Sequence, residues 1–141
     1  MTVRFIDASV FVHAFLRPRR ELQSHERAIK SKARGIVARI NEGERVVTSV
    51  VHFAEIANLL EDWMPVTDAL TIERGVCNRD TITIESVDRR DLVEALDIAS
   101  ESGIGTTDAL AISLMSRAGL RELYSFDKDF DRIANVRRIS G

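Results

Sequence analysis

Five short apolar segments alternate with helical segments along this chain of 141 residues, and this alternation limits the possible folds more than any other feature. The short segments are rich in β-branched residues, which favours strands. The segments between them carry apolar residues three or four positions apart, which is typical of helices that bury one face. This order predicts a three-layer α/β/α fold with a central, mostly parallel five-stranded sheet. Because no linker or repeat interrupts the pattern, we expect one domain over residues 1–141.

The boundaries of the expected elements follow from turn and capping residues. We place strands at 3–6, 45–48, 82–84, 122–125 and 136–139. We place helical segments at 8–16, 21–43, 50–64, 66–77, 89–102, 107–119 and 127–133. The spacing of apolar residues predicts core positions for Trp63, Leu92 and Leu96, and Cys77 is expected to be a small core residue.

Four acidic residues stand close to the expected carboxyl ends of strands. Asp7 interrupts the apolar stretch VRFIDASVFV directly after the first strand, and Asp127 follows the fourth strand. Asp108 opens an apolar helix, and Glu55 lies about two turns into another helix. In open α/β sheets, ligands bind outside the carboxyl ends of the strands. We therefore expect these four carboxylates to meet at one edge of the sheet.

Each acid also has a simpler structural interpretation. Asp7, Asp108 and Asp127 stand at helix starts, where a carboxylate can cap backbone amides and interact with the helix dipole. Glu55 lies too deep in its helix to be a cap, although it can still be an ordinary surface residue. Asp129 and Asp131 follow Asp127 closely, and we expect both to face solvent on a short helix.

Four carboxylates at one place would repel one another unless some were protonated or a cation neutralised them. The candidate ligands are all oxygen atoms, with no cysteine or histidine among them. Oxygen ligands favour a hard cation, Mg²⁺ or Mn²⁺, over zinc. The three histidines, His13, His25 and His52, are scattered and form no recognisable metal or catalytic motif.

Four segments, FIDASVFV, VVTSVVHFAEIANLL, GIGTTDALAISLM and LYSFDKDF, resemble the acidic motifs of the PIN-domain family, most closely those of toxins of the VapBC toxin–antitoxin type. The resemblance extends from Arg4 to Phe130. It implies an endoribonuclease that cleaves single-stranded regions of RNA with metal-activated water. It assigns the catalytic and metal-binding roles to Asp7, Glu55, Asp108 and Asp127.

The resemblance also implies supporting residues and partners. Ser9 and Ser125 match small polar residues beside the acids, and either Thr106 or Thr107 can reach the metal shell. Family members commonly form homodimers and bind a small antitoxin protein that obstructs the site. An alternative is a PIN-like module that binds nucleic acid or a partner protein without catalysis.

Charge is distributed unevenly along the chain. Residues 1–40 contain nine Arg or Lys and three Asp or Glu, whereas the whole chain has a net charge of −2. Arg17, Arg19 and Arg20 form a basic cluster that can either be a solvated surface or bind RNA phosphates. A single cysteine, no signal-peptide pattern and no membrane-length apolar run predict a cytoplasmic protein that does not enter a membrane.

Other families with an acid after the first strand fit less well. A haloacid-dehalogenase phosphatase needs a second aspartate two residues after the first, where this chain has Ser9. A receiver domain needs paired acids after its first strand, and FIDAS lacks them. A dinucleotide-binding domain needs a glycine loop after a strand, but the GIG at 103–105 stands between two expected helices.

Overall fold

The computed structural model describes residues 3–141, so two residues of the expected domain lie outside the described part. In this part, five strands form one parallel sheet in the order β3-β2-β1-β4-β5. The strands are β1 (Arg4–Ile6), β2 (Val46–Ser49), β3 (Ile82–Glu85), β4 (Glu122–Tyr124) and β5 (Arg137–Ile139). The predicted parallel five-stranded sheet is therefore confirmed.

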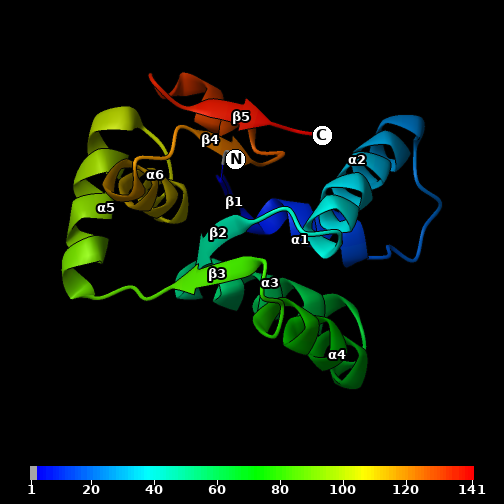
Figure 1. Cartoon of the computed structure of the whole chain (residues 1–141). Helices are drawn as coiled ribbons and strands as arrows, with labels where there is room; N and C mark the ends of the chain where they lie inside the picture. The colour runs from blue at the N-terminus through cyan, green and yellow to red at the C-terminus, as the bar shows by residue number, and fades with distance from the viewer. Residues whose placement is uncertain (1–2) are drawn as a thin grey trace.

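Helices cover both faces of the sheet (Figure 1). They are α1 (Ala8–Phe15), α2 (Ser24–Asn41), α3 (Val50–Trp63), α4 (Val66–Cys77), α5 (Arg89–Ser102), α6 (Thr106–Ala118) and the short 3-10 helix η1 (Lys128–Arg132). Figure 1 shows α5 and α6 on one side of the sheet and the α1–α4 group on the other. This arrangement is the predicted three-layer α/β/α fold.

Neighbouring residues of β1 contribute to two separate cores. Phe5 is fully buried with Leu110 and Met115 of α6, whereas Ile6 is fully buried with Ile36 of α2 and residues of α1 and α3. Successive side chains of a strand point to opposite faces of its sheet. Because β1 is the central strand, its two faces need apolar partners on both sides, and this explains the apolar run around Asp7.

Local capping fixes several helix ends. The helix expected at 21–43 begins at Ser24, because Gln23 and Glu26 form a reciprocal capping box. Asp88 and Asp91 form a similar box at the start of α5, and that helix ends at Gly103, whose φ of 69° suits glycine. The differences from the predicted boundaries are one residue at strand ends and up to three residues at helix ends.

Four of the predicted core positions are wrong. Trp63 is 61 % exposed, Leu96 is 52 % exposed and Leu92 is 39 % exposed, although each belongs to an apolar helical stripe. Cys77, the last residue of α4, is also exposed. The physical reason is that each stripe is wider than the surface its helix covers, so residues at its border face outward. None of the described helices has the length and apolar character needed to span a membrane.

Candidate metal centre

The sheet order places the acidic residues beside a topological switch point. From β1 the chain proceeds to β2 and β3 on one side, and β4 and β5 lie on the other side. A crevice forms at the carboxyl ends of strands where the order reverses in this way. Asp7 directly follows β1, and Asp127 lies three residues after the end of β4. These two adjacent strands therefore deliver two of the four predicted acids to the same crevice.

Asp7 is buried, and two serine hydroxyl groups hold its carboxylate. Ser9 Oγ donates to Asp7 Oδ2 at 2.9 Å, and Ser125 Oγ donates to the same oxygen at 2.8 Å. Asp7 is the N-cap residue of α1, but its side chain makes no capping hydrogen bond. The capping interpretation is therefore wrong for Asp7. Both hydroxyl groups use one carboxylate oxygen, so a cation can bind the other.

Glu55 lies on α3 and is half-buried. Its pKa is raised, first because burial disfavours its charged form and then because Asp7 and Asp127 are negatively charged. The influence of these two acids, which come from other elements, indicates that Glu55 faces the same crevice. Glu55 lies on the border of the apolar stripe of α3, and from there its side chain is close enough to Asp7 and Asp127 to be affected by their charge.

Asp108 lies in the first turn of α6, whose N-cap residue is Gly105. Its side chain is half-buried, and its pKa is raised to about 7. Burial is the largest cause, followed by the negative charges of Asp127, Asp7 and Glu55. All four predicted acids therefore influence one another electrostatically, which is the condition that favours a bound cation.

Asp127 has two interactions that fix its position. Its backbone N–H donates to Ser125 Oγ at 3.0 Å, and its Oδ1 accepts the backbone N–H of Asp129 at 2.9 Å. Asp127 therefore does cap η1, as its sequence position suggested. Ser125 contacts both Asp7 and Asp127, so one hydroxyl group organises two of the acids.

The prediction that Asp129 faces solvent is wrong. Carboxylate oxygens of Asp108, Asp127 and Asp129 lie within 4.8 Å of one another, and all three side chains are half-buried. The cause is the tight 3-10 turn of η1, which returns Asp129 toward the residue that caps it. Asp131 is exposed and pairs with Arg138, as expected for a surface residue. In the sequence, the second acid of the segment DKD is the feature that could have indicated Asp129 as a further member of the cluster.

The two threonines before Asp108 differ in their exposure to solvent. Thr106 is the exposed first residue of α6, whereas Thr107 is half-buried. The carbonyl oxygen of Thr107 lies 3.1 Å from Nε2 of His52. His52 is fully buried, and its burial lowers the pKa of its imidazole. The scattered positions of the histidines in the sequence gave no indication of this contact.

The donor set fits a hard divalent cation. The ligand atoms that meet here are carboxylate oxygens, and the spacing of the Asp108, Asp127 and Asp129 oxygens permits one ion to bridge them. The pKa values of Glu55 and Asp108 are raised first by burial and then by the neighbouring carboxylates, and a bound cation would offset both effects. Asp108, Asp127 and Asp129 can therefore hold one Mg²⁺ or Mn²⁺ ion, whereas among the described residues Asp7 and Glu55 lie outside this group of oxygens.

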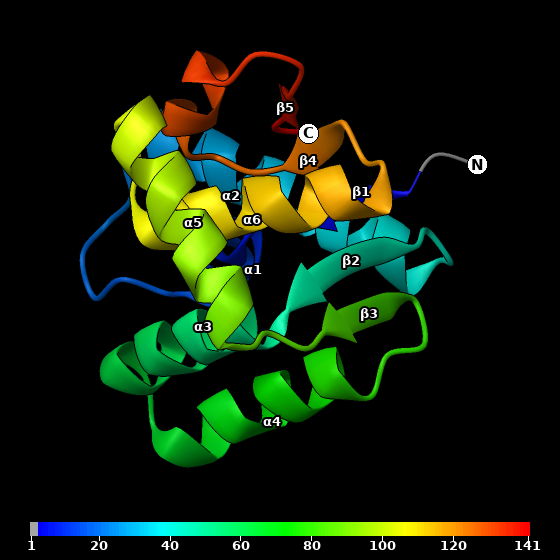
Figure 2. The same cartoon turned by 90° about the vertical axis from the view of Figure 1, so that its left-hand side faces the viewer.

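The basic cluster lies at the outer end of the α1–α2 hairpin, on the same side of the molecule as the carboxyl ends of the strands (Figure 2). Arg17, Arg19 and Arg20 are exposed, and Arg20 forms an ion pair with Glu26. Arg17 and Arg19 instead line a groove of about 1440 Å³ between the α1–α2 hairpin and the α3–α4 hairpin.

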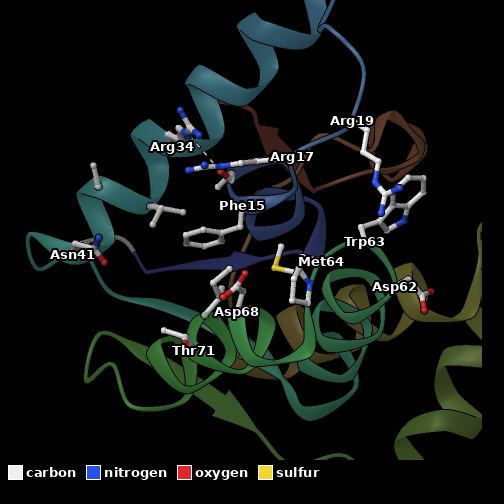
Figure 3. Close-up of a pocket in the computed structure, with 15 residues that line it drawn as sticks. Phe15, Arg17, Arg19, Arg34, Asn41, Asp62, Trp63, Met64, Asp68 and Thr71 are labelled. Carbon is white, nitrogen blue, oxygen red and sulfur yellow. Dashed lines mark hydrogen bonds between the residues drawn. The ribbon is translucent and has the colours of Figure 1, made fainter.

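Figure 3 shows this groove, with Arg17 and Arg34 on one wall and Met64 and Asp68 on the other. The exposed Trp63 also lines it. An arginine and an indole ring on one surface can contact both phosphates and bases of a single-stranded nucleic acid.

Comparisons with known proteins concern the family and the fold of the chain. The family model for the PIN domain matches residues 4–136. No curated protein matches the chain. Among solved structures, the chain is similar to Mycobacterium tuberculosis VapC20, a Sarcin-Ricin loop cleaving toxin, with a TM-score of 0.69, 18% identity, and coverage of 92% of this chain and 93% of that one.

Two toxin–antitoxin structures are also similar. VapBC2 from Rickettsia felis, bound to a DNA fragment from its promoter, has a TM-score of 0.66 and 12% identity, with 98% of each chain covered. VapBC-1 from nontypeable Haemophilus influenzae has a TM-score of 0.66 and 13% identity, with 99% of this chain and 98% of that chain covered. At these identities the likeness concerns the fold.

Proposed function

Because the chain belongs to the PIN domain family, we propose that it is a metal-dependent endoribonuclease and the toxin of a toxin–antitoxin pair. The observation that supports this proposal is the electrostatic influence of Asp7 and Asp127 on both Glu55 and Asp108, which come from separate parts of the chain. The proposed substrate is a single-stranded region of RNA. The similar solved proteins include a Sarcin-Ricin loop cleaving toxin and two VapBC structures, which supports both parts of the proposal.

The proposed ion is Mg²⁺ or Mn²⁺, held by Asp7, Glu55, Asp108 and Asp127, with Asp129 beside them. Such an ion supplies an activated water and stabilises negative charge on a phosphodiester during hydrolysis. The serine hydroxyl groups keep Asp7 and Asp127 in place. Thr106 remains a proposed supporting residue because of its position at the start of α6.

The test is cleavage of labelled single-stranded RNA by the purified chain with Mn²⁺, followed by addition of EDTA. We expect cleavage that EDTA abolishes, and we expect Asp7→Asn to be inactive while its circular dichroism spectrum stays unchanged. Cleavage by Asp7→Asn at the wild-type rate would show that the assignment is wrong. RNA binding without cleavage by the wild type would instead support the catalytically silent module.

The proposed partners are a small antitoxin protein and a second copy of the chain. A homodimer is supported by apolar side chains on the outer surface of α5, where Val93 is 53 % exposed and Leu96 is 52 % exposed. Exposed apolar patches of this kind often mark contact surfaces between proteins. Light scattering after gel filtration of the wild type and of Leu96→Asp tests this: a dimer that becomes a monomer supports it, and a monomeric wild type contradicts it.

A further inference from the structure

His52 is a fully buried imidazole in the first turn of α3, three residues before Glu55, and both of its ring nitrogens have partners. Nδ1 lies 2.6 Å from Ser49 Oγ, and Nε2 lies 3.1 Å from the carbonyl oxygen of Thr107. The second contact joins two helices across 55 positions of sequence.

The hydrogen bonds determine which nitrogen carries the proton. A carbonyl oxygen can only accept, so Nε2 must donate its N–H to Thr107. In the neutral ring Nδ1 is then an acceptor, and it receives the hydroxyl proton of Ser49. Ser49 Oγ in turn accepts the backbone N–H of His52 at 3.2 Å. A neutral imidazole with its proton on Nε2 therefore satisfies every polar atom in this small network.

The carbonyl carbon of Thr107 is bonded to the backbone nitrogen of Asp108, so the two residues share this peptide group. A hydrogen bond to this carbonyl therefore holds the backbone directly beside the Asp108 side chain. The first turn of α6 needs such support, because its N-cap residue Gly105 has no side chain to bind it. Within residues 3–141, α3 and α6 are not among the helix pairs that pack extensively against each other.

The ring of His52 also contacts the central strand. The Phe5 and His52 rings meet edge to face, with centroids 5.1 Å apart and planes at 76°. Phe5 lies two residues before Asp7 on β1. His52 thus contacts α6 and β1 from its own place on α3; α6 carries Asp108, α3 carries Glu55, and Asp7 directly follows β1.

We propose that His52 is a positioning residue, which fixes the start of α6 relative to α3 so that Asp108 and Glu55 can bind one metal centre. This inference rests on the proposed metal-dependent function. Without the hydrogen bond from Nε2, mutual repulsion of the carboxylates can displace the first turn of α6, since nothing else in α3 donates to the Thr107 carbonyl within residues 3–141. Both ring nitrogens of His52 already have protein partners, Ser49 and Thr107, so we assign it no role as a ligand of the ion.

The test compares His52→Gln with His52→Asn in the full-length chain. A glutamine amide can place an N–H donor near the position of Nε2, whereas the shorter asparagine amide reaches only the region of Nδ1. Both variants bury a polar amide in place of the imidazole, so they form a matched pair that differs mainly in the bond to Thr107. Circular dichroism and thermal denaturation identify the temperature at which both are folded.

Two measurements on the folded variants do not need RNA. We expect His52→Asn to bind Mn²⁺ at least about tenfold more weakly by calorimetry, the usual size of such indirect effects on metal sites. We also expect faster hydrogen exchange at the amides of Ala109 and Leu110 in the first turn of α6, where Ala109 donates to the Gly105 carbonyl at 2.9 Å. His52→Gln should restore both properties most of the way.

Kinetics with RNA give the third measurement. A positioning role predicts a lower kcat for His52→Asn with an unchanged KM, because RNA contacts are left intact. Equal Mn²⁺ affinity and equal exchange in His52→Asn and the wild type would overturn the inference, and so would equal impairment of the glutamine and asparagine variants. A wild type that binds Mn²⁺ without cleaving RNA contradicts the proposed ribonuclease alone, since metal affinity and amide exchange still decide the role of His52.

Discussion

Ser125 Oγ donates a hydrogen bond of 2.8 Å to Oδ2 of Asp7, although the two residues are 118 positions apart in the sequence. The register of two neighbouring strands makes this contact, because Ile6 of β1 pairs with Tyr124 of β4 and the next residues are Asp7 and Ser125. The backbone N–H of Asp7 also donates to the Tyr124 carbonyl at 3.0 Å. The candidate metal centre therefore depends directly on the β1–β4 pairing.

Ser125→Ala should lower both stability and metal affinity. The substitution leaves the buried Asp7 carboxylate and the Asp127 amide each without one partner, which typically costs about 1–3 kcal/mol. Urea denaturation measures the free energy of unfolding. Ser116→Ala, at an exposed position of α6, is the control and should change that free energy by less than about 0.5 kcal/mol. Equal effects of the two substitutions would contradict the role given to Ser125.

Mn²⁺ should raise the melting temperature of the wild type more than that of Asp7→Asn. A ligand that binds only the folded state stabilises it according to its affinity, and the variant lacks one charged ligand. Differential scanning fluorimetry over a series of Mn²⁺ concentrations measures the shift. Equal shifts in the two proteins would mean that Asp7 is not part of the metal site.

The contribution of Asp108 to the stability of the metal-free protein should fall as pH rises from about 4 to about 7. The pKa of Asp108 is raised from 3.8 to about 7, mainly by burial, so the folded state holds a proton that the unfolded state has released in this range. Unfolding free energy decreases with pH wherever the folded state binds more protons. Denaturation in EDTA measures this slope. Asp108→Asn should have a smaller slope, and an unchanged slope would contradict the prediction.

Asp129→Asn should weaken Mn²⁺ binding more than Asp131→Asn does. Asp129 lies in the carboxylate cluster with Asp108 and Asp127, whereas Asp131 forms a surface ion pair with Arg138. The two substitutions remove the same charge two residues apart, so long-range electrostatic effects are nearly matched. Calorimetry with Mn²⁺ compares them. Equal loss of affinity would indicate that only overall charge matters.

The double variant Arg17→Ala and Arg19→Ala should bind RNA more weakly without a change in kcat. Both arginines are exposed and lie in the connection between α1 and α2, which Figure 2 shows on the side of the sheet toward which the strands point. The slope of log affinity against log salt should fall by about 0.7 for each RNA phosphate that an arginine no longer neutralises. Arg45→Ala with Arg121→Ala removes the same charge at the amino ends of β2 and β4, and it should leave RNA affinity nearly unchanged. Fluorescence anisotropy with labelled RNA makes the comparison.

Much of the fold could be predicted because its signals are local. Strand and helix periods, the Asp88 cap and the Gly103 stop all act within a few residues, so element type and order followed from the sequence. The border of a buried surface is not local, because it depends on what packs against a helix. For this reason Trp63 was wrongly placed in the core, although it is 61 % exposed.

Periodicity and capping residues in the sequence are enough to predict the parallel α/β architecture and to select four acids near the expected strand ends. The contacts that hold these acids appear only once the chain is folded: two serines on Asp7, a third aspartate, Asp129, beside Asp108 and Asp127, and His52 on the backbone before Asp108. The difference comes from separation along the chain. Periodicity and capping act between near neighbours, whereas the partners of a buried charge come from whichever segments the sheet order brings beside it.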